Sequence, residues 1–340
     1  MENEIDSGQI VLSSHGDGGL LTHQLLDDLF MPAFSNQWLD QCTDSAMLKY
    51  RDLHLAVTTD SFVVSPLFFK GGDIGKLAVC GTINDLVVSG ARPLWLTAAF
   101  ILPEGMELQR LSMIVQSMKI MLSTLGVPIV TGDTKVIDSG DPENLLINTT
   151  GIGLIDPETN FHPKNIRPSD IVIVSGTVGD HGAAILAERV GFSKDNAPGS
   201  DCAALLSLFE ALKDHYRSIR VLRDPTRGGL ATTMVELAEA GQVDIYLEEK
   251  SVPVKPEVAA VSGILGVDPF YLASEGRMII IASEKSGKAI LEKLKSISGA
   301  EDSAIIGFAS QGKGNVYLQT RLGGTRRLKM LAGTPLPRIC

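Results

Sequence analysis

The sequence predicts an α+β protein built from two mixed α/β domains, followed by a flexible C-terminal tail. The chain has 340 residues, which suggests about two domains at roughly 150 residues per domain. Strand-like and helix-like segments are mixed in both halves. Between the halves, residues 156–169 contain three prolines and few apolar residues, which is typical of a linker.

The first 34 residues are predicted to form an arm. A glycine-rich stretch at 15–19 is followed by apolar residues through 20–30 whose spacing fits one face of a helix. The N-terminal domain is predicted to cover 35–155. Its expected elements are a strand at 53–59, a helix at 74–88, a strand at 93–101, an amphipathic helix at 109–125, a short buried strand at 127–130 and a strand at 145–155.

The C-terminal domain is predicted to cover 170–330. Its expected strands are 171–174, 243–247, 277–282, 303–308 and 316–320, and its expected helices are 181–190, 202–213, 229–240 and 285–297. The tail, 331–340, contains Pro335 and Pro337, which fix φ and oppose helix formation. We therefore expect an extended, mobile tail that ends in Cys340.

Composition excludes several functional classes. Thirty Lys+Arg against forty Asp+Glu give a net charge of −10, with no dense basic cluster, which argues against nucleic-acid binding. No apolar run reaches the ~18 residues needed to span a bilayer, and the acidic start is unlike a signal peptide. Four cysteines without CxxC spacing indicate neither a disulfide framework nor a zinc site. We expect a cytoplasmic protein with free thiols.

Acidic residues occur where strands end or in the helix that follows. Asp60 ends one predicted strand, Asn84 and Asp85 lie in a hydrophobic helix, and Asp133 follows the short strand. Carboxylates that are brought together repel one another unless a cation offsets the charge, and Mg²⁺ prefers such oxygen ligands. Each could instead be an ordinary helix cap or turn residue.

Glycine makes up 34 of the 340 residues, above the usual ~7%. Glycine-rich stretches at 16–19, 71–75 and 228–229 could direct backbone N–H groups at phosphate oxygens. None matches the phosphate-binding or dinucleotide-binding consensus. Taken one at a time, each stretch fits an ordinary turn better than a phosphate-binding loop.

Three further residues are candidates for the chemistry. Lys135 and Glu275 could act as acid or base, although each also fits a surface ion pair. Cys340 could carry a substrate, because a thiolate on a flexible segment can reach more than one site. The other three cysteines are expected to be small buried hydrophobes; they are Cys42, Cys80 and Cys202.

Eight strings, in order along the chain, resemble the HypE family of NiFe-hydrogenase maturation proteins. The resemblance extends from about residue 10 to the end of the sequence. The strings are His15-Gly16-x-Gly18-Gly19, Thr59-Asp60-Ser61-Phe62-Val63-Val64-x-Pro66, Gly71-Gly72-Asp73-Ile74-Gly75, Gly81-Thr82-x-Asn84-Asp85-Leu86, Thr131-Gly132-Asp133-Thr134-Lys135, Asp224-Pro225-Thr226-Arg227-Gly228-Gly229, Ala273-Ser274-Glu275-Gly276 and Pro337-Arg338-Ile339-Cys340.

This resemblance implies the fold of aminoimidazole ribonucleotide synthetase and selenophosphate synthetase, which are two-domain ATP enzymes that dimerise through the sheets of their N-terminal domains. It implies ATP and Mg²⁺ as cofactors, with Asp60, Asp85 and Asp133 as metal ligands. The other implied nucleotide-binding residues are Gly16, Asp17, Gly18, Gly19, Asn84 and Thr134.

The resemblance also implies a reaction. A HypF carbamoyltransferase places a carbamoyl group on Cys340, ATP drives its dehydration to a thiocyanate, and HypC with HypD receives the cyanide on iron. Loss of phosphate from the activated carbamoyl oxygen requires proton removal from nitrogen. Glu275 is preferred as the base over Lys135, because the lysine must first lose its own proton.

Two other functions stay open at this level. A related ATP-dependent synthetase acting on a small substrate, of the selenophosphate or aminoimidazole ribonucleotide type, would be indifferent to loss of the tail. A non-enzymatic, ATP-responsive scaffold would bind a partner through the tail without turning over a carbamoylated substrate.

Overall fold

The computed structural model describes residues 10–16, 18–138, 140–192 and 197–331. Asp17 and Cys340, both predicted site residues, lie outside these ranges. In the described part of the chain, no helix is long and apolar enough to cross a membrane.

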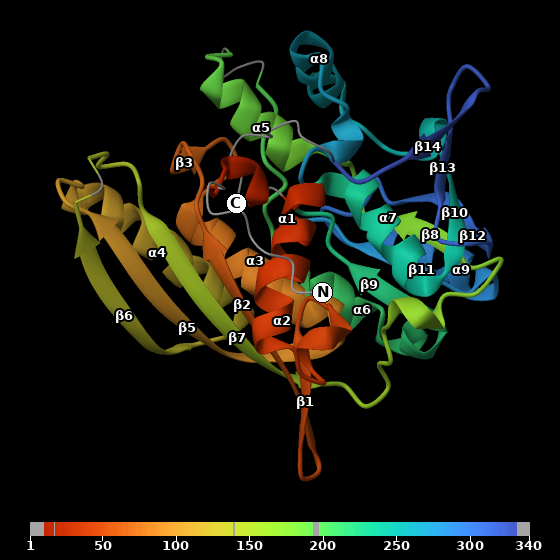
Figure 1. Cartoon of the computed structure of the whole chain (residues 1–340), viewed down its shortest axis with the longest axis horizontal. Coiled ribbons are helices and arrows are strands. Elements are labelled where there is room, and N and C mark those ends of the chain that lie inside the picture. Colours follow the sequence, from red (N-terminus) through yellow and green to blue (C-terminus); the bar gives the residue numbers. More distant parts are fainter. Residues whose placement is uncertain (1–9, 17, 139, 193–196, 332–340) are drawn as a thin grey trace.

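The N-terminal arm is helical from residue 20 to residue 34, as its apolar spacing predicts for 20–30. It contains α1 (Leu20–Leu25), a π-helical stretch (Leu26–Phe30) and α2 (Met31–Phe34). In Figure 1 these helices lie across the middle of the molecule. The arm contacts the C-terminal domain, since His23 Nε2 lies 3.2 Å from Glu236 Oε1. It also contacts the last described residue, since the Leu20 N–H donates to the Leu331 carbonyl at 3.0 Å.

The first sheet has the strand order β1-β2-β7-β5-β6. Neighbouring strands are antiparallel except for β5 and β6, which are parallel. Helices α3 and α4 cover one face, and the opposite face is uncovered (Figure 1). The elements are β1 (Ala46–Tyr50), β2 (Leu53–Phe62), the small β3 (Phe68–Phe69) and β4 (Gly72–Asp73), α3 (Ile74–Val88), β5 (Ala91–Pro103), α4 (Leu108–Leu125), β6 (Ile129–Ile137) and β7 (Leu146–Ile155).

One strand prediction is wrong in length and burial. The sequence predicts a short buried strand at 127–130, with Asp133 beyond its end. The structure instead has β6 running from Ile129 to Ile137, and all nine of its residues are exposed. The reason is position, because β6 is the edge strand of its sheet. Apolar residues on such a strand indicate an uncovered surface rather than a core.

The second sheet has the order β14-β13-β10-β12-β8-β11-β9. Both sheets lie in α/β layers, which confirms the predicted fold class. The elements are β8 (Ile171–Val174), α5 (Asp180–Arg189), α6 (Leu206–Ala211), β9 (Ile219–Arg223), α7 (Gly229–Gly241), β10 (Val243–Glu248), α8 (Pro256–Leu265), β11 (Ile279–Ala282), α9 (Glu284–Lys295), β12 (Ala304–Gln311), β13 (Val316–Gln319) and β14 (Thr325–Leu328). The predicted limits of the two domains and of the linker at 156–169 stay predictions.

The central element of the fold is α3, which is buried on nearly all sides. Its N-cap is Asp73, whose side chain accepts hydrogen bonds from the N–H groups of Gly75 and Lys76, satisfying donors that every helix start leaves free. Apolar residues of α3 share one core with β8, β11 and α9 of the C-terminal domain. The helix therefore joins the two domains through packed apolar surface.

We predict that Gly75→Ala destabilises the protein by about 1–3 kcal/mol, because overpacking a core forces neighbours to shift. A Cβ on Gly75 would lie 2.6 Å from the Ile114 carbonyl oxygen. The matched control is Gly263→Ala in α8, where a Cβ would meet nothing within 4 Å and alanine is worth up to ~1 kcal/mol in a helix. Urea unfolding measures both, and equal effects would contradict this account of α3 packing.

Candidate functional site

Three carboxylates from distant parts of the chain meet between the domains. They are Asp44, just before β1, Asp85 in α3, and Asp224, just after β9. One oxygen from each lies within 4.8 Å of the others. We call these three residues the acidic cluster. Asp85 is the one member that was predicted as a metal ligand.

Burial and mutual repulsion perturb all three groups. Burial, followed by the charges of Asp60, Asp224 and Asp44, raises the pKa of Asp85 well above its ordinary value. Burial and Asp44 raise the pKa of Asp224 to about 7. The pKa of Asp44 is also raised, again mainly by burial. Asp224 is buried and Asp44 and Asp85 are half-buried, and three carboxyls with raised pKa values at one point form a ligand set that suits a hard divalent cation.

Neighbouring side chains hold the acidic cluster in place. The Thr58 hydroxyl donates to Asp85 Oδ2 at 2.7 Å, and Arg223 Nε lies 3.0 Å from Asp44 Oδ1. Arg223 also pairs with Glu236 at 3.1 Å, and Glu236 in turn lies 3.2 Å from His23 Nε2. A chain of polar contacts thus links helix α1 of the arm to the acidic cluster.

Asp60 lies on the helix-covered face of the first sheet, and Asp133 does not. In the register of the sheet, Asp60 on β2 lies opposite Thr149 on β7, Thr149 lies opposite Ala98 on β5, and Ala98 lies opposite Gly132 on β6. Asp60 and Asp133 are therefore separated by three strand spacings, or about 14 Å. Because side chains alternate along a strand, Asp133 points to the uncovered face.

Within a single chain, Asp133 thus lies apart from Asp60 and Asp85, and the assignment of all three as metal ligands stays a prediction. Asp60 acts on the acidic cluster through its charge, since it raises the pKa of Asp85. Asp133 instead pairs with Lys135 at 2.9 Å on β6, with both side chains exposed. Thr134 is exposed on the same strand. Any function of these three β6 residues stays a prediction.

Asn84 joins the two domains. Its Nδ2 donates to the carbonyls of Ala203 and Glu275, at 3.1 and 3.2 Å, and its Oδ1 accepts from the Leu205 N–H at 2.8 Å. These bonds explain why the predicted helix at 202–213 begins only at Leu206, since the preceding backbone pairs with Asn84. The predicted role of Asn84 in nucleotide binding stays a prediction.

Glu275 lies in the same buried region and is 2% exposed. Its Oε1 has no hydrogen-bond partner among the described residues. Burial raises its pKa well above the ordinary value, and the charges of Asp224, Asp201 and Asp60 add to the effect. A buried carboxyl with a raised pKa and an unpaired oxygen has the properties of a general acid or base.

The glycine-rich segment of the arm lies against the motif that follows Asp224. A Cβ on Gly18 would lie 2.8 Å from Arg227 Cβ, and one on Gly19 would lie 2.5 Å from the Leu331 carbonyl oxygen. Gly16 is described and Asp17 is not. The arm therefore packs beside the acidic cluster and beside the last described residues, and it leaves no room there for side chains.

The cysteines differ from expectation at one position. Cys80 and Cys202 are buried as predicted, but Cys42 is exposed, because it lies in the connection before β1 rather than in a packed element. Sequence reasoning also missed two members of the acidic cluster. Asp224 carried a signal, since it opens one of the quoted strings. Asp44 carried none, because only the fold brings it to the other two.

Comparison with known proteins agrees with this architecture. The AIR synthase related protein N-terminal domain matches residues 42–155, and the AIR synthase related protein C-terminal domain matches residues 167–318. Fold and site thus define a two-domain protein of the AIR synthase related class.

More specific relatives narrow the class. The chain is 43% identical over 327 residues to carbamoyl dehydratase HypE of Azotobacter vinelandii, covering 96% of each chain. It matches HypE in a HypE–HypF complex with TM-score 0.85 and 41% identity, covering 90% of this chain and 99% of that one. It matches HypE bound to ATP with TM-score 0.81 and 43% identity, covering 97% and 100%. The chain belongs to the carbamoyl dehydratase HypE family of hydrogenase maturation proteins.

The raised pKa values of the acidic cluster predict how the stability of the fold depends on pH. A carboxyl whose pKa is higher in the folded state stabilises the fold most below its unfolded pKa, and this stability is lost as pH rises through the folded pKa. For Asp224 that window runs from 3.8 to about 7. We predict that, without divalent cations, Asp224→Asn becomes more stable relative to wild type across this window, by about 1 kcal/mol or more. Chemical unfolding at several pH values measures this difference, and a constant difference would contradict it.

Proposed function

We propose that this carbamoyl dehydratase removes water from a carbamoyl group carried on Cys340, using ATP bound beside the acidic cluster. The observation that carries the proposal is the meeting of Asp44, Asp85 and Asp224 with buried Glu275 at the domain boundary. The family relationship supports the reaction, and the ATP complex of a relative that is 43% identical supports the nucleotide.

Mg²⁺ fits the donors present. All three members of the acidic cluster offer a carboxylate oxygen, and their raised pKa values reflect charge that a divalent cation would offset. We propose that these residues hold Mg²⁺, with Asp60 adding negative charge nearby. When bound with ATP, the ion supplies charge stabilisation for the transferring phosphoryl group.

The proposed reaction balances without an external oxidant. The carbamoyl oxygen of Cys340–S–C(=O)NH₂ takes the γ-phosphoryl group, and ADP leaves. The C–O bond then breaks, inorganic phosphate leaves with the oxygen, and both nitrogen protons are lost. Sulfur stays attached to carbon throughout, and the product is Cys340–S–C≡N.

Glu275 is the proposed base for the nitrogen protons. Its raised pKa favours the protonated form, and positive charge from a bound cation would favour the ionised form that accepts a proton. Lys135 is less well placed for this role, because it lies on the uncovered face of the first sheet, paired with Asp133. After Glu275 has accepted a nitrogen proton, that proton would have to pass to solvent or to the product.

We propose that the chain forms a homodimer through the uncovered face of the first sheet. Trp95, Ile101, Ile137 and Leu154 are all exposed there, and apolar area of this kind marks an interface. Asp133, Thr134 and Lys135 lie on the adjoining edge strand. If these residues contribute to a nucleotide site, they would do so across the dimer.

Two partners complete the proposed pathway. The solved HypE–HypF complex of a relative that is 41% identical supports a HypF-like carbamoyltransferase as the donor. The thiocyanate product calls for an acceptor that takes cyanide from sulfur, which we propose to be a HypC–HypD-like iron complex. Both encounters would take place in the cytoplasm.

We predict that Cys340→Ser abolishes formation of the thiocyanate and leaves ATP affinity unchanged, because the serine oxygen replaces the sulfur that carries the carbamoyl group. Mass spectrometry of the C-terminal peptide, after incubation with the carbamoyl donor and then ATP, should show a carbamoyl adduct that loses one water only in wild type. Cys42→Ser removes an exposed thiol and should behave like wild type. Water loss from the Cys340→Ser peptide would disprove the carrier role.

We predict that Ile101→Glu converts the dimer to a monomer, because a carboxylate at the centre of an apolar interface loses its solvation. Leu322→Glu is the control, since Leu322 is 99% exposed in the other domain. Sedimentation velocity should give a monomer for the first variant and a dimer for the second. A dimer for both would place the interface elsewhere.

A further inference from the structure

We propose that Asp201, held by Arg277, is a positioning residue for Glu275. The inference rests on the proposed function, since it assigns a support to the proposed base. It concerns a buried polar network formed by Asp201, Arg277, Asp180 and Thr177, all in the C-terminal half of the chain. The network has no place in nucleotide or metal binding as described above.

The main chain of Glu275 is fixed on both sides. Its N–H donates to Asp201 Oδ1 at 3.1 Å. Its carbonyl accepts from Asn84 Nδ2 at 3.2 Å and from the Ala203 N–H at 3.4 Å. One contact thus comes from the N-terminal domain, and the other two come from the loop before α6.

Packing leaves this loop little freedom. A Cβ on Gly276 would lie 1.9 Å from the Asp201 carbonyl oxygen, so the residue after Glu275 lies directly against the loop. Asp201 is fully buried at its side chain. Movement of Asp201 would therefore be transmitted to the Glu275 peptide rather than absorbed by solvent or empty space.

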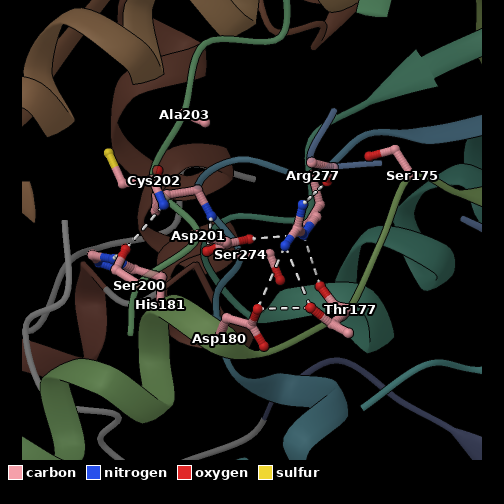
Figure 2. Close-up of polar contacts among 12 residues, drawn as sticks. Ser175, Thr177, Asp180, His181, Ser200, Asp201, Cys202, Ala203, Ser274 and Arg277 are labelled. Carbon is pink, nitrogen blue, oxygen red and sulfur yellow. Dashed lines mark hydrogen bonds and ion pairs between the residues drawn. The ribbon is translucent and has the colours of Figure 1, made fainter. Parts of the chain in front are cut away.

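Arg277 lies between two buried carboxylates, Asp201 and Asp180 (Figure 2). Its Nε approaches Asp201 Oδ2 to 3.4 Å, and its NH2 approaches Asp180 Oδ2 to 3.5 Å. Because Nε already donates to the Thr177 carbonyl at 3.0 Å, its contact with Asp201 is an ion pair without a hydrogen bond. Asp201 is thus attracted toward Arg277 while its other oxygen stays free for the Glu275 N–H.

The remaining guanidinium contacts fix Arg277 itself. NH1 donates to the Gly299 carbonyl at 2.9 Å and NH2 to Thr177 Oγ1 at 3.4 Å. Lys255 Nζ lies 2.6 Å from Asp180 Oδ2. Two cations thus balance two buried carboxylates, which makes the network neutral and lets it persist out of water.

Asp201 also influences Glu275 through its charge. Burial raises the pKa of Asp201 to about 6, against the lowering effect of Arg277, so Asp201 is charged at neutral pH. The charged groups that act on Glu275 are Asp224, Asp201 and Asp60, which raise its pKa, and Arg227, which lowers it. The nearby Cys202 thiol is buried against Cys80, and its pKa is raised. A substitution that removes only the charge of Asp201 should lower the pKa of Glu275.

The test uses the full-length chain carbamoylated on Cys340, and measures the single-turnover rate of water loss with saturating ATP and Mg²⁺. Asp201→Ala removes the acceptor of the Glu275 N–H and should slow the reaction by about 10²-fold, the effect of a small misplacement of a reacting group. ATP affinity should stay within about twofold of wild type. The double variant Asp201→Ala/Glu275→Gln should be no slower than Glu275→Gln alone.

The matched control is Ser175→Ala. Ser175 Oγ accepts from the Met278 N–H at 2.8 Å, so this variant also removes a buried side-chain acceptor from a main-chain N–H, three residues further along. It should dehydrate at the wild-type rate. If Asp201→Ala fails to fold, Asp201→Asn takes its place in the test, because it keeps an oxygen acceptor for the Glu275 N–H. It should recover the rate to within a few fold and shift the acidic limb of the pH–rate profile to lower pH.

The outcomes separate the two proposals. A wild-type rate for Asp201→Ala, with a slow Glu275→Gln, would overturn the positioning role and leave the base assignment intact. Equal losses in Asp201→Ala and Ser175→Ala would also overturn it, because the effect would be one of general stability. A wild-type rate for Glu275→Gln would overturn the base assignment, and with it this inference.

Discussion

The repulsion among the carboxylates that meet at the domain boundary is the constraint on which the rest of the structure depends. Asp44, Asp85 and Asp224 reach this point from a connection, a helix and the end of a strand. The charge of Asp60 adds to this repulsion, and Glu275 is buried nearby with a raised pKa. Such an arrangement costs stability, and proteins keep it where a cation or a reaction uses it.

The surrounding fold holds these carboxylates together. Helix α3 carries Asp85 and Asn84, and its apolar residues share a core with both domains. Arg223 and Glu236 tie Asp44 to the arm. The glycine-rich segment packs beside Arg227 and Leu331, so the arm, the site and the start of the tail are in contact.

Much of this could be predicted from sequence, and the failures have physical reasons. The predicted helices 74–88 and 109–125 agree with the structure almost to the residue, because apolar spacing along a helix is a local signal. The site depends on long-range contacts, and local pattern says nothing about which face of a strand a residue occupies. Asp133 was grouped with Asp60 for that reason, although strand alternation sends it to the other face. Asp44 was missed because its neighbours in sequence resemble any polar connection.

The most direct measurement is the number of protons released when Mg²⁺ and ATP bind. Calorimetry at pH 6.5 in buffers of different ionisation enthalpy gives this number, once the release by free MgATP is subtracted. Because Asp224 has a pKa of about 7 and Asp85 a higher-than-ordinary one, the acidic cluster should release protons as the cation binds, and Asp224→Asn should release fewer. Binding without proton release in the wild-type protein would contradict the account of a protonated carboxylate site that accepts the metal.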